Sequence, residues 1–173
     1  MLAQKKRETK ETGIDVTVET EGSGASRIET GIVLLDEILS AFASGSKFDL
    51  TVFARGDLQT GDHHTTEDVG ITLGSAIGQV IKSGMGSASV PCGQALARAA
   101  VRFGEPGFRL DFTFRARELG GVSLENFGHF LRSISYAANF TLAIQADGGD
   151  DKSKMLAMSL ALGRAVARAK RDE

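Results

Sequence analysis

The sequence is poor in cysteine, and it has no excess of positive charge and no long apolar run. Its single cysteine, Cys92, excludes an intrachain disulfide framework and favours a reducing compartment. Twenty Lys and Arg against 22 Asp and Glu give a net charge of −2, so general binding to a nucleic-acid backbone is not expected. No apolar run approaches the roughly 18 residues of a transmembrane helix, and residues 1–10 lack the apolar stretch of a signal peptide. We therefore expect a soluble cytoplasmic protein that binds neither nucleic acid nor membrane.

The rest of the composition is that of a globular protein. The chain has 173 residues, of which 42% are hydrophobic and 24% charged, as in ordinary folded domains and unlike disordered chains. This length suits one compact domain over residues 1–173.

Hydrophobic periodicity divides the chain into strands and helices. Apolar residues alternate, as in half-buried strands, over residues 14–18, 48–54, 108–114 and 140–146. Apolar residues recur at helical spacing over residues 32–45, 69–80, 127–134 and 154–168. Residues 26–29 are predicted to be the hairpin partner of the first of these strands. Residues 83–89, with two glycines among small residues, are predicted to form a linker.

The two halves of the chain resemble each other. Each contains a helix, a strand, an acidic glycine-containing loop and a second helix. When Asp62 is aligned with Asp151, residues 73–76 (Leu-Gly-Ser-Ala) fall on residues 162–165 (Leu-Gly-Arg-Ala). This similarity predicts an internal duplication of βα units stacked as a layered α/β domain. The approximate repeats are residues 1–83 and 90–173.

One segment, residues 61–68, concentrates the residues capable of chemistry. His63 and His64 precede Glu67 by four and three residues, so the three side chains share one helix face. Two imidazoles and a carboxylate form a partial site for a divalent metal, with Asp62 or Asp68 orienting a ring. The alternative is an exposed helix start whose acidic residues favour the helix dipole. The remaining histidine, His129, is interpreted as a surface or helix-packing residue.

Several motifs together resemble those of the imidazoleglycerol-phosphate dehydratase family. They are Arg-Glu-Thr-Lys-Glu-Thr at 7–12, Thr-Gly-Ile-Val-Leu-Leu-Asp-Glu-Ile-Leu at 30–39, Phe-Asp-Leu at 48–50, Gly-Asp at 56–57 and Asp-His-His-Thr-Thr-Glu-Asp-Val-Gly-Ile-Thr-Leu-Gly at 62–74. The resemblance implies an internally duplicated fold with helices packed between two mixed β-sheets. It also implies a cytoplasmic lyase of histidine biosynthesis that removes water from imidazole glycerol phosphate.

The resemblance further implies a manganese cofactor, a homo-oligomer of twenty-four subunits, and active sites between subunits. Carried onto this chain, it assigns His63, His64 and Glu67 as metal ligands, with Glu37 as a further candidate ligand. Glu67 is also the candidate catalytic residue, and Glu11 is the candidate substrate-binding carboxylate.

The chain departs from the family pattern at several functional positions. Glu37 replaces a histidine, and a second His-His-x-x-Glu motif is replaced by Lys152, Ser153 and Leu156. Further replacements affect a strand histidine, an acidic pair and phosphate-binding residues. They lie at Ala143, at Gly93 and Gln94, at Gly104-Glu105-Pro106 and near Gly84.

Three hypotheses follow from these losses. The chain is a diverged dehydratase with altered ligands such as Glu37 and Asp150 or Asp151, a non-catalytic paralogue that retains the fold and assembly, or an interaction protein that reuses the oligomeric scaffold. Because half of the ligands are replaced by residues that cannot bind a metal ion, we expect catalysis to be weakened or lost.

Overall fold

A computed structural model describes residues 1–172, apart from the side chain of Thr60. The first half of the chain forms four strands and two helices. These elements are β1 (Leu2–Glu8), β2 (Thr12–Glu19), β3 (Ser26–Glu29), α1 (Val33–Ser46), β4 (Asp49–Gly56) and α2 (His63–Val80). A short 3₁₀ helix, Leu58–Thr60, precedes α2.

The second half of the chain forms the same succession of elements. They are β5 (Met85–Cys92), β6 (Ala95–Phe103), β7 (Gly107–Asp111), α3 (Leu124–Ala138), β10 (Phe140–Asp147) and α4 (Asp151–Arg171). One small hairpin, β8 (Glu118–Leu119) and β9 (Val122–Ser123), is inserted before α3.

The two four-stranded sheets have equivalent topologies. Sheet A has the strand order β1-β2-β4-β3, and sheet B has the order β5-β6-β10-β7. In each sheet the first two pairings are antiparallel and the last is parallel. Each half therefore repeats one topology, in which α1 corresponds to α3 and α2 corresponds to α4.

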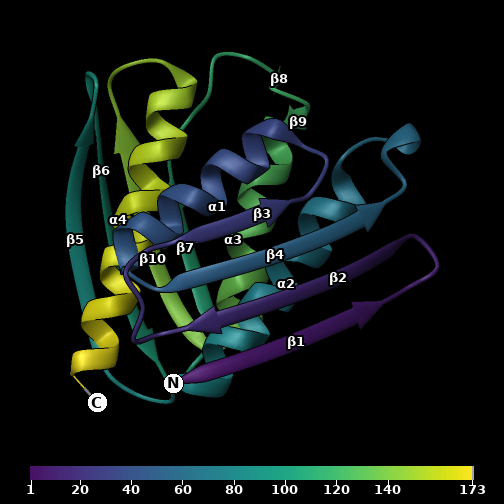
Figure 1. Cartoon of the computed structure of the whole chain (residues 1–173). Coiled ribbons are helices and arrows are strands. Elements are labelled where there is room, and N and C mark those ends of the chain that lie inside the picture. Colours follow the sequence, from purple (N-terminus) through teal and green to yellow (C-terminus); the bar gives the residue numbers. More distant parts are fainter. Residues whose placement is uncertain (173) are drawn as a thin grey trace.

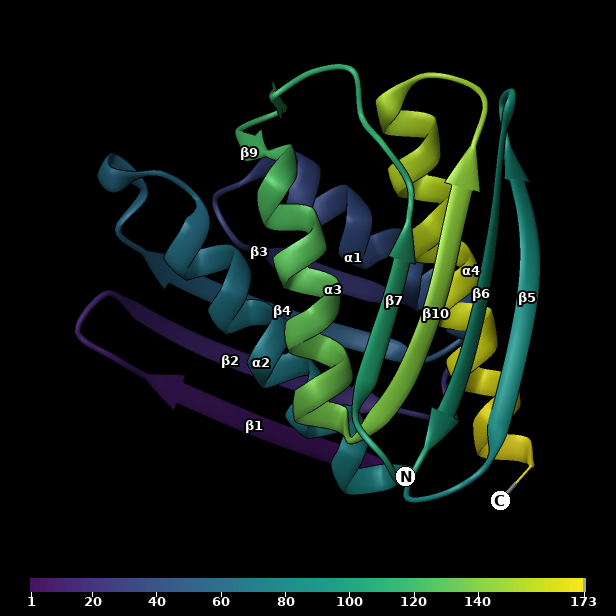
Figure 2. The ribbon, with the colours of Figure 1, turned by 180° about the vertical axis from the view of Figure 1, so that it is seen from behind.

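The four helices lie between the two sheets (Figures 1 and 2). The helices α1 and α2 contact sheet A, whereas α3 and α4 contact sheet B, and the two layers meet where α2 packs on α3 and α1 on α4. The inward residues of the strands are buried, as Val16 of β2 and Leu142 of β10 illustrate. The helices packed between two mixed sheets confirm the fold class predicted from the sequence.

Glycines allow the helices of the middle layer to approach closely. Gly70, Gly74 and Gly78 follow one line along α2 and face the backbone of α3. A Cβ atom at position 74 would lie 2.5 Å from the carbonyl oxygen of Ile134, so only glycine fits there without moving a helix. These contacts fix the position of α2 relative to α3.

Three local predictions are wrong. Residues 26–29 form a strand, but β3 pairs in parallel with β4 and not with β2, because the intervening helix α1 makes the crossover that parallel strands require. Residues 85–89 belong to β5 and not to a linker. The strand predicted over 108–114 ends at Asp111, although Phe112 and Phe114 still pack against the core.

No helix described for residues 1–172 combines the length and the apolar character needed to cross a bilayer.

Candidate functional site

The predicted metal-ligand motif lies at the beginning of α2. His63 and His64 are the first two residues of the helix, and Glu67 follows one turn later. The Nε2 atom of His63 lies 3.3 Å from Oε2 of Glu67. The rings of His63 and His64 lie 5.6 Å apart, measured between centroids. The helix therefore places His63 and Glu67 in direct contact and His64 beside them.

A hydrogen-bond chain orients the ring of His63. Asn126 of α3 donates through Nδ2 to Asp62 at 3.0 Å, and its Oδ1 lies 3.1 Å from Nδ1 of His63. Because Asn126 uses its amino group on Asp62, its oxygen accepts the Nδ1–H of His63. This arrangement directs the Nε2 lone pair at Glu67. It is also the arrangement of metal-binding histidines, which donate their other ring N–H to a fixed acceptor.

A third histidine, His129 of α3, joins this group. Its ring centroid lies 6.1 Å from that of His63, at an interplanar angle of 87°. From the sequence, His129 is expected to be a surface or helix-packing residue. We call His63, His64, Glu67 and His129 the histidine cluster; His63, Glu67 and His129 are each about half exposed.

The two aspartates beside the motif have different partners. Asp62 binds Asn126, so it orients His63 through that amide. Asp68 faces sheet A, where it accepts hydrogen bonds from Arg7 (2.9 Å, from Nε) and from the hydroxyl of Thr12. Asp68 therefore fastens α2 to the first strands and does not contact a histidine ring.

The predicted substrate-binding residue Glu11 lies in the turn between β1 and β2. Its backbone oxygen accepts a hydrogen bond of 3.1 Å from the backbone of Asp57, in the segment that leads to α2. The side chain of Glu11 is exposed. The turn that carries Glu11 is therefore tied to the same end of the molecule as the histidine cluster.

The equivalent position in the other repeat holds a different pair of residues. Lys152 follows Asp151 at the start of α4 as His63 follows Asp62 at the start of α2, and the Nζ atom of Lys152 lies 2.9 Å from Oε2 of Glu37 on α1. Glu37 stands 11 residues before Phe48, which immediately precedes β4, and His129 stands 11 residues before Phe140, the first residue of β10 (48 − 37 = 11; 140 − 129 = 11). Lys152 and Glu37 thus correspond to His63 and His129. We call them the lysine–glutamate pair.

The lysine–glutamate pair is separate from the histidine cluster within one chain. Glu37 contacts α4, and no hydrogen bond or ion pair within residues 1–172 joins it to His63, His64 or Glu67. Ser153, the next residue at this end, donates its backbone N–H to the capping carboxylate of Asp150 at 2.7 Å. Leu156, one turn further, carries no donor atom. The structure therefore does not bring Glu37 together with the other three candidate ligands.

The histidine cluster and the lysine–glutamate pair, which lie at the two ends related by the repeat, differ in their fit to a divalent metal. At the histidine cluster a ring lone pair faces a carboxylate oxygen at 3.3 Å, a contact that is favourable when a proton or a metal ion lies between the two atoms. Donors about 2.1 Å from a shared ion are separated by roughly 3 to 3.5 Å. At the other end an ammonium offers three donors and no lone pair. The residues of the histidine cluster fit a metal ion, and those of the lysine–glutamate pair do not.

The candidate metal ligands of one chain do not form a complete centre alone. Among residues 1–172, no three His, Cys, Asp or Glu side chains converge closely enough to hold an ion. The helix starts that carry the candidate ligands are exposed at the surface of the molecule.

The duplicated sandwich is a fold shared with solved structures of known family. The family model for imidazoleglycerol-phosphate dehydratase matches residues 30–166. The chain belongs to the imidazoleglycerol-phosphate dehydratase family, which confirms the resemblance inferred from its motifs.

Individual relatives agree with this assignment. The imidazoleglycerol-phosphate dehydratase of Methanocella arvoryzae is 40% identical over 94% of this chain and 88% of its own length. The enzyme of the same name from Methanothermobacter thermautotrophicus is 40% identical over 99% of this chain and 91% of its length. The crystal structure of the dehydratase from Staphylococcus aureus has a TM-score of 0.85 at 27% identity and covers 98% of both chains.

Proposed function

We propose that this protein is a histidine-biosynthesis dehydratase whose removal of water from imidazole glycerol phosphate is weakened or lost. The two relatives described above, both named imidazoleglycerol-phosphate dehydratase, support the reaction class. The lysine–glutamate pair is the observation that supports the loss, because it occupies the counterpart of the histidine cluster. This combination favours a non-catalytic or slow paralogue.

The charge of Lys152 explains why the second end is a poor metal site. An ammonium about 4 Å from a unit positive charge is repelled by about 4 kcal/mol at an effective dielectric constant of 20, and a divalent ion doubles this figure. Glu37 neutralises the ammonium in the absence of a metal, and it would have to leave Lys152 to bind one. Neither Ser153 nor Leu156 offers a compensating anionic donor.

The histidine cluster is the proposed metal site, and manganese is the ion implied by the family. His63, His64 and Glu67 would hold it, with His129 beside them. When bound, such an ion supplies positive charge that stabilises a developing anion. The protein's own contribution is orientation. Asn126 fixes the ring of His63, so that its Nε2 atom faces Oε2 of Glu67, the candidate catalytic carboxylate.

The same proposal covers the substrate-binding residue, the assembly and the location of the protein. Glu11 would contact the substrate from the turn beside α2. Further donors for the histidine cluster would come from another copy of the chain, so we propose a homo-oligomer, for which the family implies twenty-four subunits. The proposed location is the cytoplasm.

A dehydration assay with manganese in excess tests the loss of catalysis. We expect turnover well below about 1 per second, the lower end of typical enzyme values. Turnover at or above that value would contradict the proposal. Light scattering tests the assembly, and a particle of about 18 kDa, the mass of one chain, would contradict it.

Metal content tests the assignment of the two ends. The manganese content of each variant is compared with that of the wild type after loading. His63→Ala combined with His64→Ala should abolish manganese uptake and leave the circular dichroism spectrum unchanged. Conversely, Glu37→His combined with Lys152→His should raise the metal content per chain. The matched control, Glu37→Gln combined with Lys152→Met, removes the ion pair without adding ligands and should leave the content unchanged. Equal metal content in both double variants would show that the lysine–glutamate pair does not determine metal binding.

A further inference from the structure

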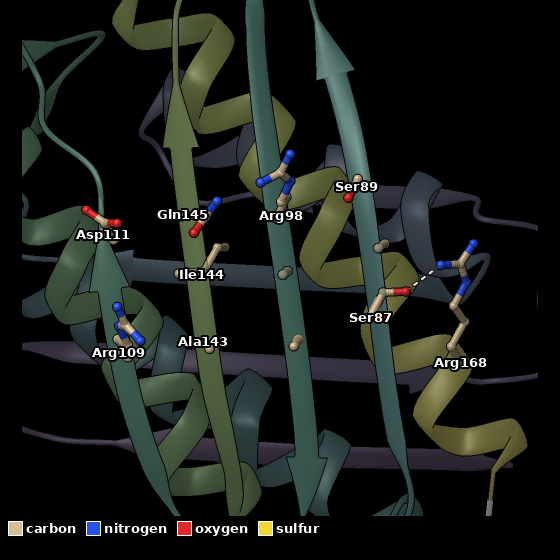
Figure 3. Close-up of a pocket in the computed structure, with 12 residues that line it drawn as sticks. Ser87, Ser89, Arg98, Arg109, Asp111, Ala143, Ile144, Gln145 and Arg168 are labelled. Atoms are coloured by element: carbon tan, nitrogen blue, oxygen red, sulfur yellow. Dashed lines mark hydrogen bonds between the residues drawn. The ribbon is translucent and has the colours of Figure 1, made fainter.

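The outer face of sheet B carries arginines at its centre. Arg98 and Arg102 of β6 and Arg109 of β7 point away from the helices. The strand register places Gln145 of β10 opposite Arg98, and Ala143 opposite Arg109. Figure 3 shows Arg98 and Arg109 on either side of β10, with Gln145 and Ala143 of β10 between them. This face is far from the helix starts that carry the histidine cluster, because it lies on the other side of the sheet from the helices.

The charges on the outer face of sheet B have no partners within the described chain. No ion pair or hydrogen bond within residues 1–172 involves the side chains of Arg98, Arg102 or Arg109, and none involves that of Asp111 on the same face. Sheet A is the matched comparison, because it has the same topology. There every outward charge has a partner. The partners are Lys6 and Asp15, Arg55 and Glu8, Arg27 and Glu29, Glu19 and the N-terminal amine, and Asp49 and the backbone N–H groups of residues 23–25.

Three of these unpaired charges, Arg98, Arg109 and Asp111, line a cavity of about 520 Å³, within the size range of small-molecule sites. Ala100 and Ala143 face each other across two strands and form its floor. Arg98 pairs with Gln145 and Arg109 with Ala143, so two strand spacings and an offset of two residues separate their backbones by about 12 Å. Arg168 borders the cavity from α4 and donates a hydrogen bond to the backbone oxygen of Ser87.

We propose that this cavity binds a small organic phosphate that carries hydroxyl groups. Arginine presents a fork of N–H donors that matches the oxygens of a phosphate. Arg98 and Arg109 approach the alanine floor from opposite sides, so one tetrahedral dianion between them accepts from both. Asp111 lines the same cavity, and an ionised carboxylate only accepts hydrogen bonds. Asp111 therefore favours a ligand that carries hydroxyl donors, and it repels a ligand that carries further negative charges.

A second copy of the chain is a poorer occupant of this face. Its sheet A offers outward carboxylates, but each of these already has a partner within its own chain. Docking it on sheet B would require those pairs to break before new ones formed. A soluble anion has no such competing partner.

Calorimetric titration of the full-length protein in its native assembly tests the site. Chelator-treated protein is titrated with glycerol 3-phosphate, glycerate and glycerol to about 10 mM, which saturates a site of millimolar Kd. We expect saturable binding of glycerol 3-phosphate, at least tenfold weaker binding of glycerate and none of glycerol. Equal affinity for glycerate, or no saturable binding of the phosphate, overturns the proposal.

The site is located by comparing double variants that each remove two arginines. Arg98→Gln combined with Arg109→Gln should weaken binding of glycerol 3-phosphate at least tenfold. Arg27→Gln combined with Arg55→Gln removes two arginines from the outer face of sheet A and should leave the affinity unchanged. His63→Ala combined with His64→Ala should also leave it unchanged, which separates this site from the proposed metal site. Equal weakening in both arginine pairs, or a loss in the histidine variant, refutes a site on sheet B.

Discussion

Replacing Gly74 by alanine tests the close packing of α2 on α3. The new Cβ would lie 2.5 Å from the carbonyl oxygen of Ile134 and 2.9 Å from Cβ of Ala137. Ordinary contact begins at 3.4 Å, so the helices must separate by up to 0.9 Å (3.4 − 2.5). Overpacking of this kind costs about 3 kcal/mol, the upper part of the usual range. Alanine recovers about 1 kcal/mol through its higher helix propensity, which leaves a net loss of about 2 kcal/mol.

Gly128→Ala is the matched control. It lies on α3, and a Cβ there would meet only Cδ1 of Leu110, at 3.6 Å. Without a clash, the propensity gain should stabilise the protein by up to about 1 kcal/mol. Thermal unfolding followed by circular dichroism should show a lower Tm for Gly74→Ala by about 4 to 8 °C. The reasoning is refuted if Gly74→Ala is as stable as the wild type, or if Gly128→Ala is equally destabilised.

Three further predictions concern buried and surface polar groups. Thr65→Val should stabilise the fold by about 1 kcal/mol, because the buried hydroxyl of Thr65 has no hydrogen-bond partner among the described residues; denaturant unfolding measures this, and a loss of stability would contradict it. Lys152→Met should change the free energy of unfolding by less than about 1 kcal/mol, because the ion pair with Glu37 is largely exposed; a larger loss would assign the pair a structural role. The backbone N–H groups of Ser23 and Ala25 lower the pKa of Asp49 below its usual 3.8. Its stabilisation is therefore complete above that pH and is lost as the pH falls through the lower folded-state pKa. The Tm difference between wild type and Asp49→Asn should shrink on acidification from about pH 6 to about pH 2, and a constant difference would contradict this assignment.

Periodicity was sufficient for the elements that have one buried face and one exposed face. The helices α1 and α3 and the strands β2, β4 and β10 begin and end close to the predicted positions. The strand β5 could not be recognised because Gly86 was taken as the sign of a flexible linker. A Cβ at Gly86 would lie 2.0 Å from the carbonyl oxygen of Ala165, so the close approach of α4 requires this glycine, and no turn is involved.

The edge strand β1 carries little sequence signal. Ala3 is its only buried residue, and all of its other positions except Leu2 carry polar or charged residues. An edge strand that carries charged residues resists pairing with other chains, and the same charges remove the alternation that would reveal it.

The candidate site was only partly accessible from sequence. His63, His64 and Glu67 form a local motif, so helical spacing alone placed them on one face. His129 and Asn126 lie on another helix, more than sixty residues away, and no local pattern connects them to His63. The repeat contained a usable signal, because His129 and Glu37 occupy equivalent positions before equivalent strands. Aligning α1 with α3 would have shown that His129 and Glu37 occupy corresponding positions in the two repeats.

The crossed packing of the helices has a consequence for symmetry. The histidine cluster joins α2 of the first repeat to α3 of the second, and the lysine–glutamate pair joins α1 of the first to α4 of the second. Two identical half-length chains packed in this way would be related by a twofold axis and would carry the same residues at both ends. A substitution in such a dimer changes both ends together. Covalent linkage of the halves removes this constraint, so one end of a single chain can retain histidines while the other becomes an ion pair.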